Sequence, residues 1–407
     1  MLKQTAESRD RGIQLVLGGK DAYVDLGAMR DVLFGHHADR DLGWSLCWDE
    51  PAWPIESPSD EFRLATQSGP ICLAVRHSLR AKTTVCESMN YSVGDYAFGL
   101  ERQPTDGKSK YEMVSNGFHL ARPQARPYVI GPPVKSYGFP DTARLSFTNA
   151  DFLQGFELSF ERAMATVQYL GPLREDPQRQ YTWSGNQPVG VGSRGELVVD
   201  ALLAARERGQ KVRTGPKSHH KLENYVATWL QRLGLVDAFK VEEVREGSSI
   251  FQVLVRQAPR SAWVPITDVG FGVSQVLPVL TLCFAAPENS TIILEQPEIH
   301  LHPKVQSGLA DVLIDAIRTR GVQLIVESHS EHLLQRLLRR IAEAKVAPDE
   351  AALYFCDNPG SGSTIERLEV DLFGSIRNWP RDFFGDPLGE SLATVEAAQH
   401  RRLSASA

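Results

Sequence analysis

Residues 291–334 read TIILEQPEIHLHPKVQSGLADVLIDAIRTRGVQLIVESHSEHLL, and this stretch decides the fold. Its apolar run 292–294 is typical of a strand buried on both faces. The run ends in Glu295-Gln296-Pro297-Glu298, so acidic side chains follow the strand directly. Pro303 then opens a helix that Gly321 closes, with an apolar face made of Val305, Leu309, Val312, Leu313 and Ile317.

The same pattern recurs in the next segment. A second apolar run, residues 322–326, ends in Glu327-Ser328-His329, and Ser330 can cap the helix that follows. The apolar positions of that helix are Leu333, Leu334, Leu337, Leu338 and Ile341. A third run, residues 351–355, completes a β-α-β-α-β series, which predicts adjacent or near-adjacent parallel strands. Open parallel sheets bind ligands beyond the carboxyl ends of their strands, where both polar clusters are expected.

The two clusters carry a family resemblance. The first resembles the Walker B segment of P-loop ATPases, and the second resembles the switch-histidine segment of ABC-type ATPases. With the words P-E-x-x-L-H-P and S-H-S, the chain resembles the ATPase head of RecF, the SMC proteins and the OLD-type (overcoming lysogenisation defect) ATPases. The resemblance implies an α/β P-loop NTPase fold, an ABC-type head with a mixed sheet, an attached antiparallel β-subdomain and a small C-terminal β-hairpin domain.

The resemblance also assigns roles to individual residues. Glu295 takes the magnesium position, Gln296 the position of the catalytic glutamate, and His329 that of the switch histidine that senses the γ-phosphate. Gln296 departs from the family pattern, because an amide cannot act as a general base at neutral pH. Either hydrolysis is slow, or another carboxylate takes the role, with Glu298 the nearest candidate. Residues 301–303 fall where the family has its dimer-contacting D-loop.

A glycine- and serine-containing segment, DVGFGVSQ at residues 268–275, begins an apolar helix just before the Walker B-like strand. Such a helix start suits anion binding. Its position matches the ABC signature motif, although the wording departs from L-S-G-G-Q. By resemblance, Gly272, Ser274 and Gln275 contact the γ-phosphate of ATP bound to a second subunit, whereas the alternative is a plain helix cap.

The phosphate-binding motif G-x-x-x-x-G-K-[ST] does not occur in the sequence. Gly107-Lys108-Ser109 lacks the first glycine and reads as part of a hairpin, and Gly215-Pro216-Lys217-Ser218 has a proline before its lysine and follows no predicted strand. The opening MLKQT resembles a segment within the helix that follows the P-loop in relatives. The chain is therefore expected to begin roughly 30 to 40 residues, about one β-loop-α unit, after the point where the family's chains begin. A misassigned start codon, a truncated gene or a degenerate family member would each account for this.

Residues 12–149 alternate apolar runs with turn clusters, which resembles the antiparallel β-subdomain of ABC-type heads. The runs 13–17, 22–26, 71–75 and 96–100 are examples. A short helix near the nucleotide is expected over residues 32–36. His36 and His37 are interpreted as solvated turn residues.

The middle of the chain offers three arginines for anion contact. A helix predicted over residues 152–167 leads into a proline-rich loop with Arg174 and Arg179, and Arg194 lies in the glycine-rich segment 190–196. Arginine suits bidentate contacts to phosphate or carboxylate, so contact with phosphate or DNA and a salt-bridged structural loop both stay open. Beyond them, an amphipathic helix is predicted over residues 221–233, and a hairpin around Gly247 is predicted from the runs 239–244 and 250–255.

Other site classes are weakly supported. His300 and His302 form an H-x-H pair like that of zinc-dependent amidohydrolases, but too little chain follows for a barrel of roughly 250 residues. A plain polar turn is the remaining alternative. The five cysteines lack C-x-x-C spacing, so neither a disulfide framework nor a zinc ribbon is predicted, and a reducing cytoplasm fits. The formal charge of −6 gives no global nucleic-acid signal. No apolar run approaches the roughly 18 residues of a membrane span.

Four parts are expected along the chain. Residues 1–150 are the N-terminal part of the head with its β-subdomain, residues 151–262 a helical and loop insert with a hairpin, and residues 263–356 the ATPase core. Residues 357–407 form a C-terminal domain. Its words NWP at 378–380 and FFGD at 383–386 resemble a domain of unknown function found on a subgroup of these ATPases.

The resemblance implies an ATP- and magnesium-dependent ATPase acting as a homodimer, in which two heads sandwich ATP and switch between two arrangements. Family analogy suggests DNA repair, DNA metabolism or defence against phage. DNA and a separately encoded nuclease or effector are the candidate partners, since the chain has neither room nor the acidic motif for a Toprim nuclease. The competing hypotheses are a truncated or degenerate nucleotide-binding scaffold without turnover, and DNA binding without nucleotide control.

Overall fold

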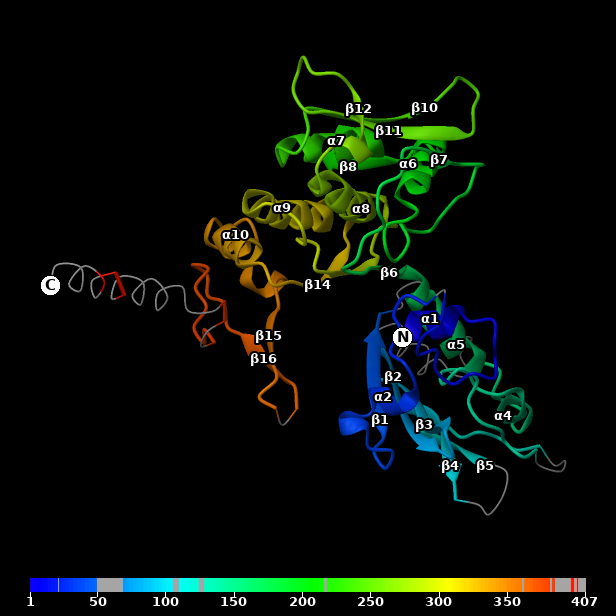
Figure 1. Cartoon of the computed structure of the whole chain (residues 1–407). Coiled ribbons are helices and arrows are strands. Elements are labelled where there is room, and N and C mark those ends of the chain that lie inside the picture. Colours follow the sequence, from blue (N-terminus) through cyan, green and yellow to red (C-terminus); the bar gives the residue numbers. More distant parts are fainter. Residues whose placement is uncertain are drawn as a thin grey trace. The chain divides into compact units, whose positions relative to one another are not determined.

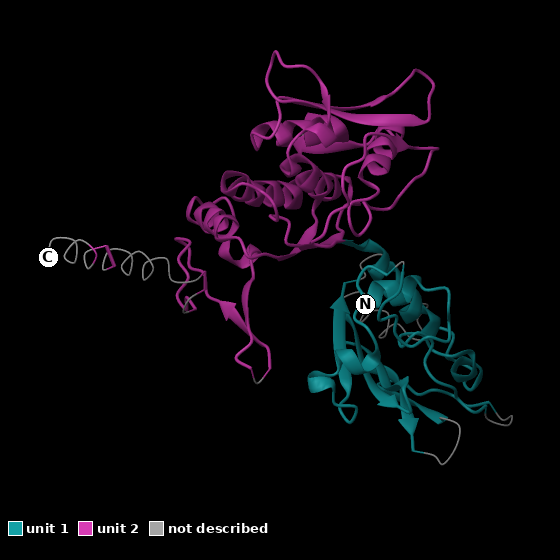
Figure 2. Cartoon of the chain, in the orientation of Figure 1, with its two compact units in different colours: residues 1–169 teal, residues 170–407 magenta. Residues whose placement is uncertain are grey.

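The computed structural model describes residues 1–20, 22–49, 69–104, 110–123, 128–215, 218–360, 362–380, 383–384, 397–398 and 401. The chain divides into two compact units, residues 1–169 and residues 170–407 (Figure 1 and Figure 2). Antiparallel and parallel sheets occur together with helices, which confirms the predicted mixed α/β class. None of the described helices is long and apolar enough to cross a membrane.

Unit 1 is built on a five-stranded antiparallel sheet with the order β1-β2-β3-β4-β5. The strands are β1 (Leu42–Trp48), β2 (Ile71–Arg80), β3 (Thr83–Val93), β4 (Tyr96–Gln103) and β5 (Lys110–Asn116). Two of the predicted runs, 71–75 and 96–100, lie in β2 and β4, so the predicted β-subdomain is present. The pairing of Gln103 with Lys110 agrees with a hairpin between β4 and β5, although residues 105–109 lie outside the described residues.

The helices of unit 1 include one that shares an aromatic core with this sheet. They are α1 (Leu2–Glu7), α2 (Met29–Val32), α4 (Asp141–Leu145) and α5 (Leu153–Thr166), with the short helix η1 (Phe34–His36). Phe156 of α5 stacks on Tyr91 of β3, with ring centroids 5.0 Å apart. Both the helix predicted over residues 152–167 and the short helix predicted over residues 32–36 are confirmed.

Two predicted strands of unit 1, residues 13–17 and 22–26, are wrong, because both runs are irregular. The side chain of Gln4 bridges the two runs, which share one backbone hydrogen bond, from the Leu26 N–H to the carbonyl oxygen of Leu17 at 2.7 Å. Its Nε2 donates to the carbonyl oxygens of Val16 and Val24 at 2.7 and 3.2 Å, and its Oε1 accepts the Val24 N–H at 3.2 Å. Leu15 and Leu17 still bury their side chains, in a small cluster with α2. The apolar pattern therefore marks core residues here without forming strands.

A disulfide joins Cys47 and Cys72, so the prediction that the cysteines form no disulfide is wrong for this pair. The two residues face each other in the antiparallel register of β1 and β2. Their 25-residue separation is not a recognisable motif, and only the strand pairing brings them together. Cys86 and Cys283 are buried thiols, and Cys356 is exposed.

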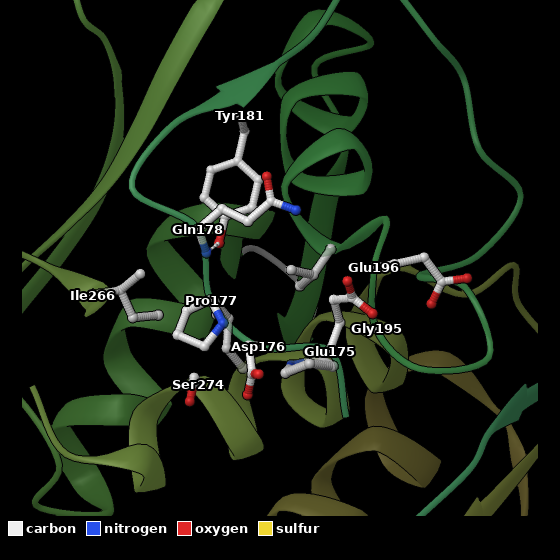
Figure 3. Close-up of a pocket in the computed structure, with 12 residues that line it drawn as sticks. Glu175, Asp176, Pro177, Gln178, Tyr181, Gly195, Glu196, Ile266 and Ser274 are labelled. Atoms are coloured by element: carbon white, nitrogen blue, oxygen red, sulfur yellow. Dashed lines mark hydrogen bonds between the residues drawn. The ribbon is translucent and has the colours of Figure 1, made fainter. Parts of the chain in front are cut away.

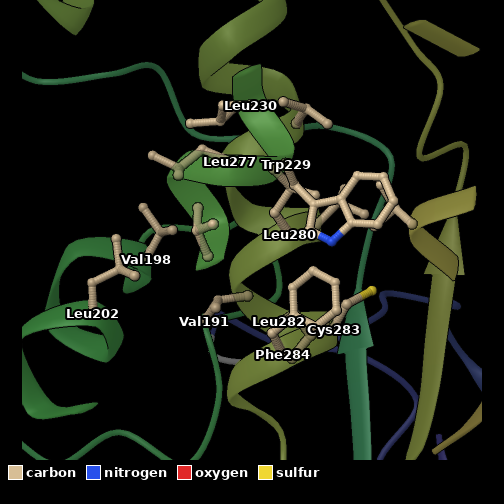
Figure 4. Packing of buried hydrophobic residues seen from close by; sticks show 14 of the residues in the cluster. Val191, Val198, Leu202, Trp229, Leu230, Leu277, Leu280, Leu282, Cys283 and Phe284 are labelled. Carbon is tan, nitrogen blue, oxygen red and sulfur yellow. The ribbon is translucent and has the colours of Figure 1, made fainter. Parts of the chain in front are cut away.

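In the described part of unit 2, five α-helices surround one hydrophobic core (Figure 4). They are α6 (Val198–Glu207), α7 (Leu222–Arg232), α8 (Phe271–Ala285), α9 (Pro303–Arg320) and α10 (Glu331–Ala342). Two short helices, η2 (Ile266–Asp268) and η3 (Pro348–Glu350), precede α8 and follow α10. Trp229 of α7 stacks on Phe284 of α8, with ring centroids 6.5 Å apart.

Antiparallel strands lie beside these helices. The predicted hairpin around Gly247 is present as β10 (Ala238–Glu243) and β11 (Ile250–Arg256), and β11 also pairs with β7 (Tyr181–Thr182) and β12 (Val264–Pro265). A second hairpin joins β8 (Lys211–Gly215) to β9 (Ser218–Lys221). The expectation that no strand precedes Gly215-Pro216-Lys217-Ser218 is therefore wrong. Residues 216–217 themselves lie outside the described residues.

The central parallel pair consists of β13 (Thr291–Glu295) and β14 (Gln323–Glu327). They belong to a three-stranded sheet with the order β14-β13-β6, and the boundary between the units falls within β6 (Val167–Leu170). Ile292 and Leu294 of β13 are buried in the core, whereas Ile293 is only partly buried. The expectation of a strand buried on both faces is wrong, because the core that α8 and α9 share contains only the alternate residues Ile292 and Leu294.

Two further expectations about this region are corrected. The third run forms β15 (Leu353–Asp357), but it pairs antiparallel with β16 (Thr364–Leu368) in a separate two-stranded sheet rather than joining β13 and β14. Only six residues separate the two strands along the chain, so this local pairing is available. On α9, Ile317 is exposed and Ala316 fills the core position instead.

Candidate functional site

The turn after β13 has an unusual backbone. Gln296 adopts a left-handed conformation with φ of 43°, and His300 does so with φ of 60°. The Gln296 N–H donates to the carbonyl oxygen of Glu327 at 2.9 Å, and the Leu301 N–H donates to the carbonyl oxygen of Glu298 at 3.1 Å. Left-handed conformations cost a non-glycine residue roughly 1–2 kcal/mol, and such strain is concentrated at functional sites. The turn carries Glu298 into the interior.

Glu298 connects this turn to the one that follows β14. Its side chain is only 7% exposed. Oε1 accepts the backbone N–H of His329 at 2.8 Å, and Oε2 has no hydrogen-bond partner among the described residues. A buried carboxylate oxygen without a partner is costly, which makes this atom a candidate for contact with a ligand or water.

Glu327 is a further candidate residue at this edge, to which the family motifs assign no role. It ends β14 opposite Glu295 in the parallel register, so the two side chains lie on the same face of the sheet. Its Oε1 lies 3.1 Å from Nε2 of His329. The signal was present in the sequence, since two strands of equal length that pair in parallel both end in glutamate.

A hydrogen-bonded chain holds the residues around the two turns. Ser330 caps α10, as predicted: its Oγ accepts the Leu333 N–H at 3.1 Å. The same Oγ donates to Oε1 of Gln306 at 2.7 Å, and Nε2 of Gln306 donates to the carbonyl oxygen of Leu301 at 2.8 Å. Gln306, on α9, therefore links the D-loop-like segment to the start of α10.

The signature-like segment forms the first turn of α8, with Gly270 as its N-cap. Ser274 and Gln275 are buried, and Ser274 Oγ donates to the carbonyl oxygen of Phe271 at 2.9 Å. A Cβ atom on Gly272 would lie 3.4 Å from Leu235 Cδ2 and 3.9 Å from Leu301 Cδ2. The start of α8 thus lies beside the D-loop-like segment.

The three arginines tie loops to this region. Arg174 is buried, and its Nη2 donates to the carbonyl oxygen of Glu295 at 3.4 Å. Arg179 pairs with Asp268 at 2.7 Å, directly before α8, and Arg194 pairs with Glu175 at 3.6 Å. These pairs favour the salt-bridged loop for Arg179 and Arg194, although both side chains also face solvent.

A hollow lies at the start of α8 (Figure 3). Gly195 lines it with φ of 80°, and a Cβ atom there would approach the ring carbons of Pro278 to 2.7 Å. The position therefore requires glycine. The other lining residues are Glu175, Asp176, Pro177, Gln178, Tyr181, Glu196, Val198, Ile266, Ser274 and Leu277.

Magnesium is the cofactor that the resemblance implies. Mg²⁺ is usually held by one or two protein carboxylates while water and phosphate fill the remaining positions. Glu295, at the end of β13, fits such a site as one of these carboxylates. The described part of the chain contains no group of three or more His, Cys, Asp or Glu side chains placed to hold a metal ion. Of the H-x-H pair, His302 uses Nδ1 to accept the Lys304 N–H at 3.2 Å, as the N-cap of α9.

Two family models match parts of the chain. A family model described as "AAA domain, putative AbiEii toxin, Type IV TA system" matches residues 93–335, and one described as "Protein of unknown function (DUF3696)" matches residues 346–392. No curated protein matches the sequence.

Solved structures that resemble the chain include SMC heads at low similarity. An SMC head bound to the C-terminal winged-helix domain of ScpA is 9% identical, covers 73% of this chain and 74% of its own, and has a TM-score of 0.34. The SMC head domain from Thermotoga maritima is 9% identical, with coverages of 74% and 75% and a TM-score of 0.31. An SMC ATPase from work on ATP-driven dimerization and DNA-stimulated activation is 13% identical, with coverages of 36% and 83% and a TM-score of 0.28.

Proposed function

Because the chain belongs to the family of AAA domains described as putative AbiEii toxin, Type IV TA system, a class of P-loop ATPases, we propose that it binds ATP with magnesium at the carboxyl ends of β13 and β14. The observation that carries the proposal is the gathering of acidic and imidazole groups at this edge. Glu295 and Glu327 end paired strands, the His329 backbone N–H donates to Glu298, and the His329 ring lies 3.1 Å from the Glu327 carboxylate.

The proposed roles follow from the groups at this edge. Glu295 supplies a carboxylate to magnesium, which would screen the phosphate charge when bound. His329, exposed beside it, contacts the γ-phosphate. Gly272, Ser274 and Gln275 present the first turn of α8, whose backbone N–H groups and positive helix end suit the phosphate of ATP held by a second copy. The functional unit in this proposal is a homodimer that closes on ATP.

Turnover in this proposal is slow. Gln296 occupies the place of the catalytic glutamate, and an amide does not take a proton from water at neutral pH. Glu298 was the nearest alternative along the sequence, but it is buried and its Oε1 already accepts the His329 N–H. Gln296 also favours a second candidate function, a nucleotide-binding scaffold that senses ATP without hydrolysing it.

The biological setting extends the same proposal. The resemblance of the motifs to RecF, SMC and OLD-type heads supports work in DNA repair, DNA metabolism or phage defence. DNA is then one candidate partner, and a separately encoded nuclease or effector is another. A cytoplasmic location accords with such a role.

Magnesium-dependent binding of a fluorescent ATP analogue to the full chain tests the proposal, together with phosphate release. Glu295→Gln should weaken binding at least tenfold, about 1.4 kcal/mol, because it removes the charge nearest the cation. Glu246→Gln, at an exposed position in the β10–β11 turn, is the matched control and should bind like the wild type. Equal binding by both variants, or no magnesium-dependent binding, would overturn the proposal. Binding without phosphate release would select the scaffold.

A further inference from the structure

Two carboxylates hold His329 from two directions. Glu298 Oε1 accepts its backbone N–H at 2.8 Å, and Glu327 Oε1 lies 3.1 Å from its ring Nε2. The first contact fixes the backbone position of His329, and the second fixes the orientation of its ring. Gln296 contacts the backbone of Glu327, since the Gln296 N–H donates to the carbonyl oxygen of Glu327 at 2.9 Å.

The backbone on both sides of the imidazole is constrained. Glu327 is the last residue of the parallel ladder, paired with Glu295, so its side chain leaves a fixed strand end. After the histidine, the Ser330 N–H donates to Ser328 Oγ at 3.1 Å, and Ser330 caps α10. The remaining freedom of His329 is rotation of its side chain, and Glu327 is the group that restricts this rotation.

The contact contributes little to the stability of the fold. The side chain of His329 is 79% exposed and that of Glu327 is 49% exposed. Ion pairs in such positions are worth about 0–1 kcal/mol, because water and salt screen them. Removing the Glu327 carboxylate should therefore change the orientation of the ring and leave the fold intact.

We propose that Glu327 is the positioning residue of His329. The Nε2–H group of the neutral imidazole donates to the Glu327 carboxylate, and Nδ1 is the ring nitrogen with a free lone pair. A neutral imidazole carries one N–H and one acceptor nitrogen, and the hydrogen bond of one nitrogen selects the tautomer. A carboxylate accepts only, so the nitrogen beside it must carry the hydrogen. The assignment supplies the proton acceptor that Gln296 does not provide.

The chemical consequence rests on the proposed function, with the contact between His329 and the γ-phosphate made through the attacking water, because the single N–H of the ring is donated to Glu327. Nδ1 takes a proton from water as the O–H bond breaks, and the water oxygen forms a bond to the γ-phosphorus. The bond between the γ-phosphorus and the β,γ-bridging oxygen breaks, and ADP leaves with that electron pair. The ring then carries a positive charge next to the Glu327 carboxylate, which stabilises it as a carboxylate does in a Ser-His-Asp triad.

Nuclear magnetic resonance of the full chain, labelled with ¹⁵N-histidine and free of nucleotide, tests the geometry. Long-range ¹H–¹⁵N correlations distinguish the two imidazole tautomers, and the His329 signals are assigned by their loss in His329→Gln. We expect the Nε2–H tautomer in the wild type, a mixture in Glu327→Ala, and partial retention in Glu327→Gln, whose amide oxygen still accepts. Glu331→Ala, two residues beyond the histidine, is the matched control and should match the wild type.

Two results would overturn the assignment. The first is an Nδ1–H tautomer in the wild type or an unchanged spectrum in Glu327→Ala. The second is a Glu327→Ala variant that loses magnesium-dependent nucleotide binding as Glu295→Gln does while keeping the wild-type tautomer, which would give the carboxylate to the cation instead. Melting temperatures within about 1 °C of the wild type confirm that the variants are folded.

Addition of ATP and magnesium separates this inference from the proposed function. If the tautomer depends on Glu327 but no His329 signal responds to nucleotide, the positioning role stands and the proposed function fails. Where phosphate release is measurable, Glu327→Ala should lower kcat at least tenfold with KM within twofold, and Glu327→Gln should recover part of the loss. A kcat equal to that of the wild type would overturn the catalytic consequence.

Discussion

Replacing Asp311 by asparagine should loosen α10, the helix that begins beside His329. Asp311 lies on α9 and accepts from two arginines of α10. Arg336 Nη1 reaches its Oδ2 at 2.6 Å, and Arg340 donates through Nε and Nη2 at 2.5 and 2.9 Å. The three side chains are only 23%, 25% and 17% exposed. The two arginines and Asp311 therefore form a network between α9 and α10.

The magnitude follows from this burial. Exposed ion pairs contribute about 0–1 kcal/mol, whereas hydrogen bonds to charged groups contribute about 1.5–3 kcal/mol. Asp311 lies between these cases and serves two partners, so its substitution should cost about 2 kcal/mol. For a domain of 150–250 residues, 1 kcal/mol lowers the melting temperature by about 2–4 °C. Differential scanning calorimetry at pH 7 should therefore show a decrease of about 4–8 °C for the unit 2 transition.

The pH dependence supplies a second check on Asp311. Burial alone would raise its pKa, but hydrogen bonds and positive charge from Arg340 and Arg336 outweigh burial and lower it below the ordinary 3.8. The network's contribution is therefore complete above the unfolded pKa and is lost as the pH falls below about 4, through the native value. The difference between wild type and Asp311→Asn should shrink over that window.

Asp349→Asn, on the exposed helix η3, is the control and should melt like the wild type. The reasoning would be refuted by an Asp311→Asn variant that melts within 1 °C of the wild type at pH 7. It would also be refuted by a difference that does not change with pH.

Three further predictions concern the core and the caps. Burial lowers the pKa of His77 to about 4, while the unfolded ring titrates near 6.5. As the pH falls, the unfolded chain therefore binds the proton first, so unit 1 should lose stability between about pH 6.5 and pH 4. His77→Gln should reduce this dependence of the free energy of unfolding on pH, measured by urea titrations. Ser330→Ala removes the α10 cap and should cost about 1 kcal/mol, seen as roughly fivefold faster hydrogen exchange of the Leu333 amide; unchanged exchange would contradict this. Leu294→Ala should lower the free energy of unfolding by about 3 kcal/mol, whereas Ile325→Ala, on the exposed face of β14, should lower it by less than about 1 kcal/mol. Similar losses in the two variants would disprove the one-sided burial of this sheet.

Helices could be predicted closely because their signals are local. The amphipathic helix predicted over residues 221–233 forms α7, and the apolar residues that recur along it at helical spacing are buried: Leu222, Tyr225, Val226, Trp229 and Leu230. Pro303 begins α9, and Gly321 ends it in a left-handed conformation with φ of 64°. Spacing within a few turns decides both which face is buried and where a helix stops, so one sequence contains enough information.

Pairings between distant residues could not be predicted in the same way. The partner of β15 is decided by a competition between a local hairpin with β16 and a distant parallel strand, and the apolar run itself does not distinguish them. Cys47 and Cys72 meet only because β1 and β2 pair in one register. Gln4 replaces a β-ladder with side-chain hydrogen bonds, which an apolar alternation does not reveal.

The candidate site shows the same division. Topology places Glu295 and Glu327 at one edge, because parallel strands end together, and this could be expected from the sequence. The partner of each carboxylate depends on the left-handed turn at Gln296, which sends Glu298 inward to the His329 amide and leaves Glu327 beside the ring. Proximity along the chain favoured Glu298 as the substitute for the missing catalytic glutamate. Proximity in space favours His329 together with Glu327. We therefore infer that these residues at the end of β14, rather than Glu298, supply the proton acceptor that the amide of Gln296 cannot provide.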